Sequence, residues 1–354
     1  MRKMYAWLIT IALMAFLASC GGPAATEGTE GDAGADTNGE VTTEAETTTD
    51  EAATEDEEAA QTSAGSEAAA RETPLNVVAT TGQIADTTRN VGGDAIELVE
   101  LLGPGIDPHT YVATEGDIST FQEADIILYN GLRLEAQMES VFEQIGESGE
   151  TTVVPVGEAI DELSLLNWEP EAGLPFDPHI WNDVRLWIEV TGAIRDTLVE
   201  ADPANAELYE ANADDYIQQL EELHEYILAE RDRVPQELRV LITAHDAFGY
   251  YARAYGFAVE AVQGISTEAE ASTADIQALA SIVVEREVPS MFIETTISHR
   301  TIEAVQEAVR AEGQEVEVGG ELYSDAMGEP GSGAETYIGM MRHNIDTIVG
   351  ALGE

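Results

Sequence analysis

The sequence predicts an α/β fold made of two βα lobes with mostly parallel sheets, joined by one long rigid helix. Two stretches, 74–202 and 235–354, alternate between short apolar runs and longer amphipathic ones. Such alternation is typical of parallel sheets covered by helices. Between them, residues 203–234 keep a helical pattern without a glycine. A helix of that length would span about 45 Å, which suits a strut across two lobes.

Strands are predicted from short apolar runs rich in β-branched residues, and helices from apolar residues that recur every three or four positions. In the first lobe the predicted strands are Leu75–Thr81, Ile96–Leu102, Asp125–Asn130 and Thr152–Val156, and the predicted helices are Gln83–Val91, Glu115–Glu123, Leu134–Ile145 and Asp183–Val199. In the second lobe the predicted strands are Arg239–Thr243, Ala258–Val262, Ser290–Glu294 and Glu315–Val318, and the predicted helices are Asp246–Tyr255, Thr273–Glu287, Arg300–Ala311 and Thr336–Leu352. The buried face of the connecting helix is predicted to hold Tyr209, Ala213, Tyr216, Leu220, Leu223 and Ile227.

Composition limits the partners that the protein can have. The chain has 354 residues, of which 69 are acidic and 15 basic, a net charge of −54, and a single lysine, Lys3. Such a surface repels nucleic acid and stays hydrated at high ionic strength, so we expect no nucleic-acid partner. A P-loop needs a lysine in its motif, so the chain is not predicted to be an ATPase of that type.

The N-terminal segment resembles the signal peptide of a bacterial lipoprotein. A charged start precedes the apolar run Ala6–Leu17, and Leu-Ala-Ser-Cys closes it at Cys20, the only cysteine. The alternatives are a membrane span, for which the run falls short of the ~20 residues required, and an ordinary signal peptide. We predict a signal peptide over 1–19 and lipidation of Cys20, which would anchor the protein to a membrane.

Residues 20–73 contain mostly Ala, Thr, Gly, Glu and Asp. A segment with so few large apolar side chains cannot bury enough surface to offset the entropy of ordering it. We therefore predict a disordered acidic tether behind the lipidated Cys20.

Four residues are candidate ligands for a metal. His109 and His179 each end an Asp-Pro-His segment, in which the proline ring restricts the backbone before the imidazole. The aspartate of each segment would orient the ring. His245 follows a predicted strand and Asp325 lies in a glycine-flanked loop after the last one. Ligands collect beyond the carboxyl ends of strands in open α/β sheets, so these residues would form a site between the lobes that suits zinc or manganese.

A single loop histidine is as often structural as it is a ligand, so the prediction rests on the whole set. We expect His224 to lie on a solvated helix face, His299 to help cap a helix, and His343 to be structural. Glu294, at the end of a predicted strand, is expected to support the site from behind or to be structural.

Several segments resemble the cluster A-I solute-binding proteins of ABC importers, and most closely the TroA-like group, which binds zinc and manganese. They are T-A-H-D-A-F-G-Y-Y-A-R-A-Y-G-F, V-Q-G-I-S-T-E-A-E-A-S, G-G-E-L-Y-S-D-A-M-G and D-P-H-I-W-N-D-V-R-L-W, within a similarity that covers about 75–353. The resemblance implies capture of a divalent metal outside the cytoplasm, at the cell surface or in the periplasm. It also implies delivery to a separate permease and ATPase, by a protein that is not an enzyme and is expected to be a monomer. Carried over by motif, the ligands are His109, His179, His245 and Asp325.

Two departures from the group leave the choice between zinc and manganese open. Zinc-specialised members often have a histidine-rich loop before the second Asp-Pro-His, whereas Asp161–Phe176 has no histidine. Manganese-specialised members often have Glu at the position of His245. Asn182 also stands where an apolar residue is common.

The main alternative is a zinc hydrolase that uses the same cleft, with Glu294 or Glu321 as general base. A catalytic zinc keeps an open position for water, whereas three histidines and an aspartate would close a tetrahedral site. The motifs H-E-x-x-H and G-x-S-x-G are both absent from the sequence. An added role in surface adhesion is compatible with a lipidated, outward-facing protein.

Overall fold

The computed structural model describes residues 73–169 and 174–353, which belong to one compact unit. The predicted signal peptide, Cys20 and nearly all of the predicted tether lie outside the described residues. Within the described ranges, no helix has the length and apolar character needed to cross a membrane.

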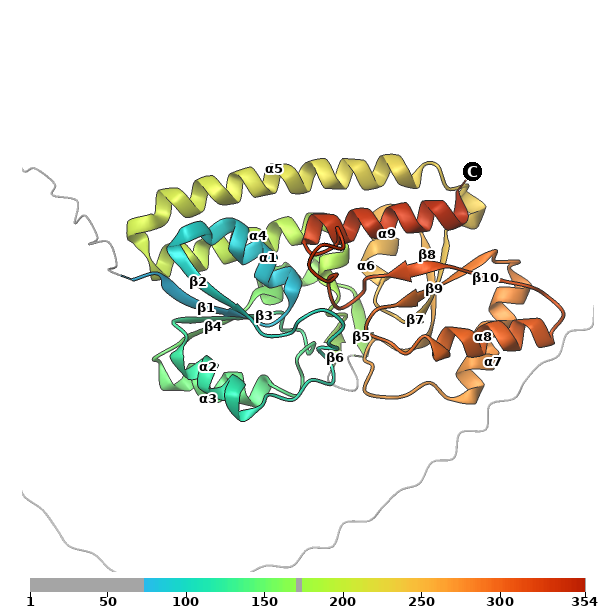
Figure 1. Ribbon diagram of the computed structural model, residues 1–354, viewed down its shortest axis with the longest axis horizontal. Coiled ribbons are helices and arrows are strands. Elements are labelled where there is room, and N and C mark those ends of the chain that lie inside the picture. Colours follow the sequence, from blue (N-terminus) through green and yellow to red (C-terminus); the bar gives the residue numbers. More distant parts are fainter. Residues whose placement is uncertain (1–72, 170–173, 354) are drawn as a thin grey trace, which may run out of the picture. The chain divides into compact units, whose positions relative to one another are not determined.

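The first lobe contains a parallel sheet with the strand order β2-β1-β3-β4. Alternate residues of a strand point to opposite faces, so Val77 of β1 packs toward α1 and α4 while Val78 packs toward α2 and α3. Figure 1 shows these two helix pairs on opposite sides of the sheet. The bounds are β1 Leu75–Ala79, β2 Ile96–Glu100, β3 Ile126–Tyr129, β4 Thr152–Pro155, α1 Gly82–Gly92, α2 Glu115–Glu123, α3 Glu139–Ser148 and α4 Val184–Ala201.

The second lobe repeats this arrangement. Strand β7 pairs in parallel with β8, β9 pairs in parallel with β10, and β7 lies beside β9. The spatial order is therefore second, first, third and fourth strand, as in the first lobe. The bounds are β7 Val240–His245, β8 Ala258–Gln263, β9 Ser290–Glu294, β10 Glu317–Leu322, α6 Gly249–Tyr255, α7 Thr273–Glu285, α8 Arg300–Ala311 and α9 Tyr337–Leu352.

The connecting helix α5 spans Ala206–Arg231 and is 26 residues long. It contacts α1 and α4 of the first lobe and α6 and α9 of the second, and it runs along both lobes in Figure 1. All six residues predicted for its inner face are buried. The two-lobed α/β fold with a long connecting helix, predicted from the sequence, is confirmed.

Strand β10 is longer than predicted, because Gly319 and Gly320 do not end it. The register with β9 shifts between Val318 and Gly320, and Gly320 has a φ of 149°, which favours glycine. A Cβ atom on Gly319 would lie 2.5 Å from the Cβ of Ala351 in α9. The two glycines therefore permit a bulge and a close helix contact, and the strand continues to Leu322.

Two helices begin later than predicted, and one hairpin was missed. Helix α6 begins at Gly249, because residues 246–248 form a turn after β7. Helix α3 begins at Glu139, because residues 132–138 form turns, the first of them with positive φ angles at Leu132 and Arg133. The short antiparallel pair β5 Asn167–Glu169 and β6 Leu174–Phe176 has no clear alternating pattern in the sequence.

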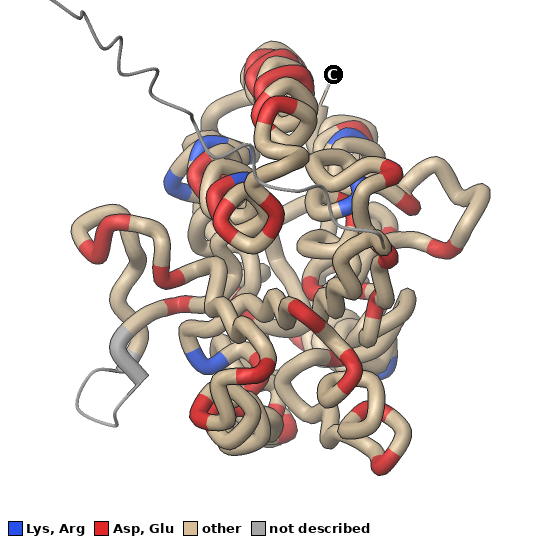
Figure 2. The backbone as a smooth tube through the Cα atoms, turned by 90° about the vertical axis from the view of Figure 1, so that its left-hand side faces the viewer, with Lys and Arg blue, Asp and Glu red and all other residues tan. Residues whose placement is uncertain are grey.

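Acidic residues outnumber basic ones along the backbone of the described chain, as Figure 2 shows. The described arginines mostly pair with a neighbouring carboxylate on the surface, for example Arg286 with Glu260 at 2.7 Å. Exposed pairs of this kind contribute little to stability. The buried cores therefore carry most of the stability of the fold.

Candidate metal centre

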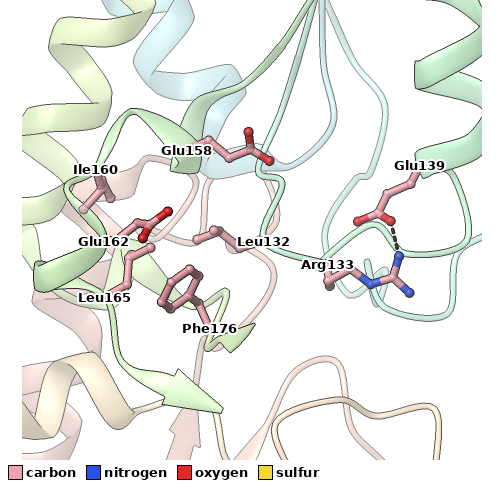
Figure 3. Close-up of a pocket in the computed structure, with 8 residues that line it drawn as sticks. All are labelled: Leu132, Arg133, Glu139, Glu158, Ile160, Glu162, Leu165 and Phe176. Atoms are coloured by element: carbon pink, nitrogen blue, oxygen red, sulfur yellow. Dashed lines mark hydrogen bonds and ion pairs between the residues drawn. The ribbon is translucent and has the colours of Figure 1, made fainter. Parts of the chain in front are cut away.

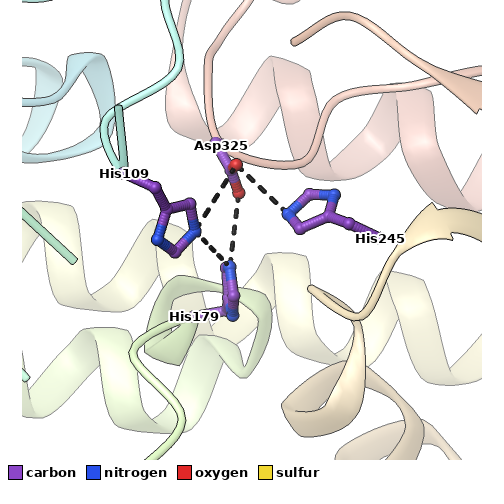
Figure 4. A group of neighbouring side chains, drawn as sticks. All are labelled: His109, His179, His245 and Asp325. Carbon is purple, nitrogen blue, oxygen red and sulfur yellow. Dashed lines mark hydrogen bonds and ion pairs between the residues drawn. The ribbon is translucent and has the colours of Figure 1, made fainter. Parts of the chain in front are cut away.

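The structure brings together the four side chains that the sequence analysis selected, His109, His179, His245 and Asp325. One ligand atom from each lies within 4.8 Å of the others, and Figure 4 shows the three imidazole rings arranged around the carboxylate. Asp325 Oδ2 is 3.2 Å from His245 Nε2 and 3.9 Å from His109 Nε2, and Asp325 Oδ1 is 3.5 Å from His179 Nε2. In the described part of the chain, this is the only such group of three or more metal-ligating side chains.

The four residues are almost completely enclosed, with exposed fractions of 0–2%. Among the described residues, neither carboxylate oxygen of Asp325 and neither ring nitrogen of His245 has a partner in hydrogen-bond geometry. Buried charged groups are costly unless they are paired or coordinate a metal. The chemistry of this cluster therefore fits a divalent cation.

The cluster keeps its carboxylate charged and one of its imidazoles neutral. Burial disfavours the charged form of Asp325, but the three imidazoles, His245 foremost, outweigh burial and hold its pKa below the usual value. Burial lowers the pKa of His109 to about 3. Burial acts in the same direction on His245, but the carboxylates of Asp325 and Glu294 raise its pKa well above the usual value.

Asp177 orients the ring of His179. Its Oδ1 atom accepts a hydrogen bond from His179 Nδ1 at 2.7 Å and another from the His179 backbone N–H at 2.9 Å. The proton on Nδ1 leaves Nε2 free to face the cluster. The predicted role of the aspartate is confirmed for this Asp-Pro-His segment.

Asp107 acts differently in the first Asp-Pro-His segment. Its Oδ1 atom accepts from the His109 backbone N–H at 2.9 Å, and its Oδ2 atom accepts from the hydroxyl of Thr267 at 2.6 Å. Asp107 therefore fixes the loop of His109 to the second lobe instead of orienting the imidazole. The sequence analysis missed Thr267, although this residue lies within the V-Q-G-I-S-T-E-A-E-A-S segment that contributes to the resemblance.

Glu294 contacts the side of the His245 ring that faces away from Asp325, in the supporting role expected for it. Strands β7 and β9 are neighbours, so their carboxyl ends place these two residues side by side. Glu294 Oε2 lies 2.5 Å from His245 Nδ1, while Oε1 accepts from the backbone N–H groups of Ala244 at 2.7 Å and His245 at 3.0 Å. Glu294 thereby directs His245 Nε2 toward Asp325.

The prediction for His224 was wrong, and the prediction for His299 was right only for its position at the start of a helix. His224 is buried, and its Nε2 accepts a hydrogen bond from Arg185 Nε at 3.0 Å. It lies four residues after Leu220 and three before Ile227, so the helical pattern itself places it on the inner face. His299 is the N-cap residue of α8, but its side chain makes no capping hydrogen bond, and its Nε2 lies 3.1 Å from Glu321 Oε1.

His343 and Asn182 both make structural contacts. His343 Nε2 lies 3.0 Å from the backbone oxygen of Glu321, which is the structural role predicted for it. Asn182 Nδ2 donates to the backbone oxygen of Ala247 at 2.9 Å. Asn182 therefore ties the segment after His179 to the turn after His245, which explains a polar residue at this buried position.

A separate cavity of about 360 Å³ lies beside the first lobe, and none of the four clustered residues lines it. Figure 3 shows Arg133 paired with Glu139 at one side, with Glu158 and Glu162 at the other. The remaining lining residues are Leu132, Ile160, Leu165 and Phe176. Its carboxylates do not meet in a group that could hold a metal among the described residues.

Two α/β lobes that enclose one ligand-binding cluster at the ends of their strands are the architecture of a two-lobed solute-binding protein. The chain belongs to the family described as ZnuA, zinc-uptake complex component A, periplasmic, whose family model matches residues 77–351. The resemblance found in the sequence is thereby confirmed.

Named relatives cover nearly all of the folded part. The zinc-binding protein TroA of Treponema pallidum is 46% identical over 288 residues, which are 81% of this chain and 92% of that protein. The manganese-binding lipoprotein MntA of Bacillus subtilis is 41% identical over 293 residues, 82% of this chain and 94% of that protein. The solved structure of the periplasmic zinc-binding protein TroA from T. pallidum matches with a TM-score of 0.77 and 45% identity, over 79% of this chain and 100% of that one.

Proposed function

We propose that the protein captures a divalent transition metal, zinc or manganese, outside the cytoplasm and delivers it to the permease of an ABC importer. The observation that carries the proposal is the enclosed cluster of three histidines and one aspartate in a chain of this family. The metal would be bound by His109, His179, His245 and Asp325. It is the transported substrate and not a catalytic cofactor.

The donor set suits both metals, but in different ways. Zinc accepts three imidazole nitrogens and one carboxylate oxygen as a four-coordinate site. Manganese prefers more oxygen ligands, and the two free oxygens of Asp325 would allow it to bind with both. Because the ligands are enclosed, uptake and release require the loops of the two lobes to separate.

The geometry gives no support to the hydrolase alternative. Both carboxylate oxygens of Glu294 contact Ala244 and His245, so Glu294 is not free to act as a general base. Glu321 contacts His299 at an exposed position. The relatives are named as metal-binding proteins.

The proposed domain organisation follows the same function. A signal peptide over 1–19 would direct export, a lipid on Cys20 would anchor the chain, and 20–73 would be a tether. Two lobes, 74–202 and 235–354, and the helix of 203–234 would then act as a monomer at the cell surface or in the periplasm. Relatives named lipoproteins and periplasmic proteins support this location.

Titration of metal-free protein with Zn²⁺ and with Mn²⁺ tests the proposal. We expect one ion per chain, and each of the variants H109A, H179A, H245A and D325A should weaken binding at least about tenfold, or about 1.4 kcal/mol. The matched control is H299A, because His299 is exposed and outside the cluster. The proposal fails if the unmodified chain binds neither ion, or if H299A weakens binding as much as H245A.

A further inference from the structure

The carboxylate of Asp325 has no hydrogen-bond donor among the described residues. Its position therefore depends on the backbone that carries it, in the loop between β10 and α9. Two buried side chains from different parts of the fold donate hydrogen bonds to this backbone. They are Asn344 and Trp181.

Asn344 holds the loop from within the second lobe. It lies on α9, and its side-chain amide makes a pair of hydrogen bonds with the backbone of one residue. Asn344 Oδ1 accepts from the Tyr323 N–H at 2.9 Å, and Asn344 Nδ2 donates to the Tyr323 carbonyl at 2.7 Å. This pair fixes the start of the loop, two residues before Asp325.

Trp181 holds the same loop from the side of the first lobe. It follows His179 by two residues, and its indole Nε1–H donates to the carbonyl of Ser324 at 2.8 Å. That carbonyl belongs to the peptide bond between Ser324 and Asp325, so its direction determines where the Asp325 side chain begins. A rotation of this peptide would move the carboxylate away from the imidazoles.

The indole of Trp181 is itself held in place. Its ring meets the imidazole of His179 edge-on, with centroids 5.3 Å apart, and its backbone carbonyl accepts from the Tyr337 hydroxyl at 2.7 Å. Trp181 therefore contacts one histidine of the cluster directly and the aspartate through a peptide group. It links a ligand of the first lobe to a ligand of the second.

We propose that Trp181 is a positioning residue for the fourth ligand: its indole N–H holds the Ser324–Asp325 peptide so that the Asp325 carboxylate reaches the bound ion. This inference rests on the proposed metal capture and refines it. Asp325 completes the coordination only while the segment carrying His179 and Trp181 lies against the second lobe. The ion therefore becomes fully coordinated as the lobes meet.

The test is Co²⁺ titration of the full chain carrying Trp181→Phe, with Co²⁺ as a coloured substitute for zinc. Phe keeps an aromatic ring against His179 but lacks the N–H. Loss of a residue that orients a metal ligand typically weakens metal affinity 10–100-fold. We therefore expect W181F to bind Co²⁺ about tenfold more weakly than the unmodified chain. Four-coordinate Co²⁺ absorbs visible light more strongly than Co²⁺ with additional water ligands. The visible absorption of W181F should therefore fall toward that of D325N.

Trp187→Phe is the matched control. Trp187 is also buried, and its indole N–H also makes one hydrogen bond, to the hydroxyl of Thr87 at 2.9 Å. Its ring stacks on Tyr337, with centroids 5.3 Å apart, and phenylalanine keeps an aromatic ring there, while its indole N–H makes no described contact with the loop of Asp325. W187F should therefore keep the affinity of the unmodified chain within about twofold and keep its spectrum, while it loses a comparable packing contact.

The outcomes separate this inference from the proposed function. Unchanged affinity and spectrum in W181F, while the unmodified chain binds Co²⁺, would overturn the positioning role and leave metal capture standing. The positioning role would also be overturned if W181F and W187F lost Co²⁺ affinity equally and both kept the visible spectrum of the unmodified chain. Loss of packing around either tryptophan would then explain both results. Failure of the unmodified chain to bind Co²⁺ would overturn both proposals. If W181F does not fold, benzothienylalanine at position 181, which keeps the shape of indole without the N–H, takes its place with the same expected results.

Discussion

Replacing Glu294 by Gln changes the surroundings of the cluster but leaves all four proposed ligands in place. One oxygen of Glu294 accepts hydrogen bonds from the backbone N–H groups of Ala244 and His245 at 2.7 and 3.0 Å, and the other forms an ion-pair contact of 2.5 Å with Nδ1 of the His245 ring. A glutamine amide has one acceptor oxygen, and its NH₂ group can only donate. E294Q therefore cannot satisfy the backbone donors and a protonated Nδ1 at the same time.

The side-chain amide of E294Q has the lower free energy when its oxygen accepts from the two backbone N–H groups. The NH₂ group then faces His245 Nδ1, which must accept, so the ring proton moves to Nε2. That atom faces Asp325 and would bind the metal. For the metal to bind Nε2, the ring must carry its proton on Nδ1, where the NH₂ group cannot accept it, and the cluster also loses one negative charge beside His245. We expect affinity to fall about 10–100-fold, or about 1.4 to 2.8 kcal/mol.

Calorimetric Zn²⁺ titration in competition with a chelator measures this loss. Glu321→Gln is the matched control, because Glu321 also lies beside an imidazole, His299 at 3.1 Å, but is exposed and outside the cluster. E321Q should bind Zn²⁺ with an affinity within about twofold of the unmodified chain, because solvent-exposed ion pairs contribute little free energy. The reasoning is refuted if E294Q binds as tightly as the unmodified chain, or if both variants lose affinity equally.

Three further predictions concern pH, metal choice and the N-terminal segment. Burial lowers the pKa of His109 to about 3, so this imidazole stays neutral, whereas the raised pKa of His245 means that metal must displace a proton there. The rise in melting temperature caused by metal should therefore shrink as pH falls from about 7 to about 5; a rise that stays constant would contradict this. Zn²⁺ should displace Mn²⁺ at equal concentrations, and H245E should narrow the difference in affinity between the two ions. Tighter binding of Mn²⁺ than of Zn²⁺ by the unmodified chain in calorimetry would contradict this. Cys20→Ser should release the chain from membranes in cell fractionation, and deletion of 21–72 should leave the melting temperature unchanged; a large loss of stability would show that the segment packs against the lobes.

Much of the fold and the candidate cluster could be predicted because both depend on local patterns. Buried parallel strands such as β9 are short apolar runs, and its bounds, Ser290–Glu294, are those predicted. The two Asp-Pro-His segments and the strand-end His245 identify themselves by residue type and position. Once two lobes are predicted, the ends of their strands can face each other, which brings distant residues such as His109 and Asp325 together.

Other features depend on contacts between segments that are far apart in the sequence. The continuation of β10 through Gly319 and Gly320 depends on the close approach of α9. The hydrogen bond from Thr267 to Asp107 and that from Trp181 to Ser324 each join residues more than 100 positions apart. His224 shows a different failure, because the acidic residues beside it indicated solvent while its helical spacing placed it in the core.

Anomalous diffraction from crystals grown with zinc tests the central claim most directly. The account predicts one strong zinc peak per chain, within about 2.0–2.2 Å of a ring nitrogen of each of His109, His179 and His245 and of an oxygen of Asp325. It also predicts that this peak is absent from crystals of D325A grown at the same limiting zinc concentration. A principal zinc peak elsewhere, for example beside Glu158 and Glu162 in the separate cavity, with none at the four residues, would contradict it.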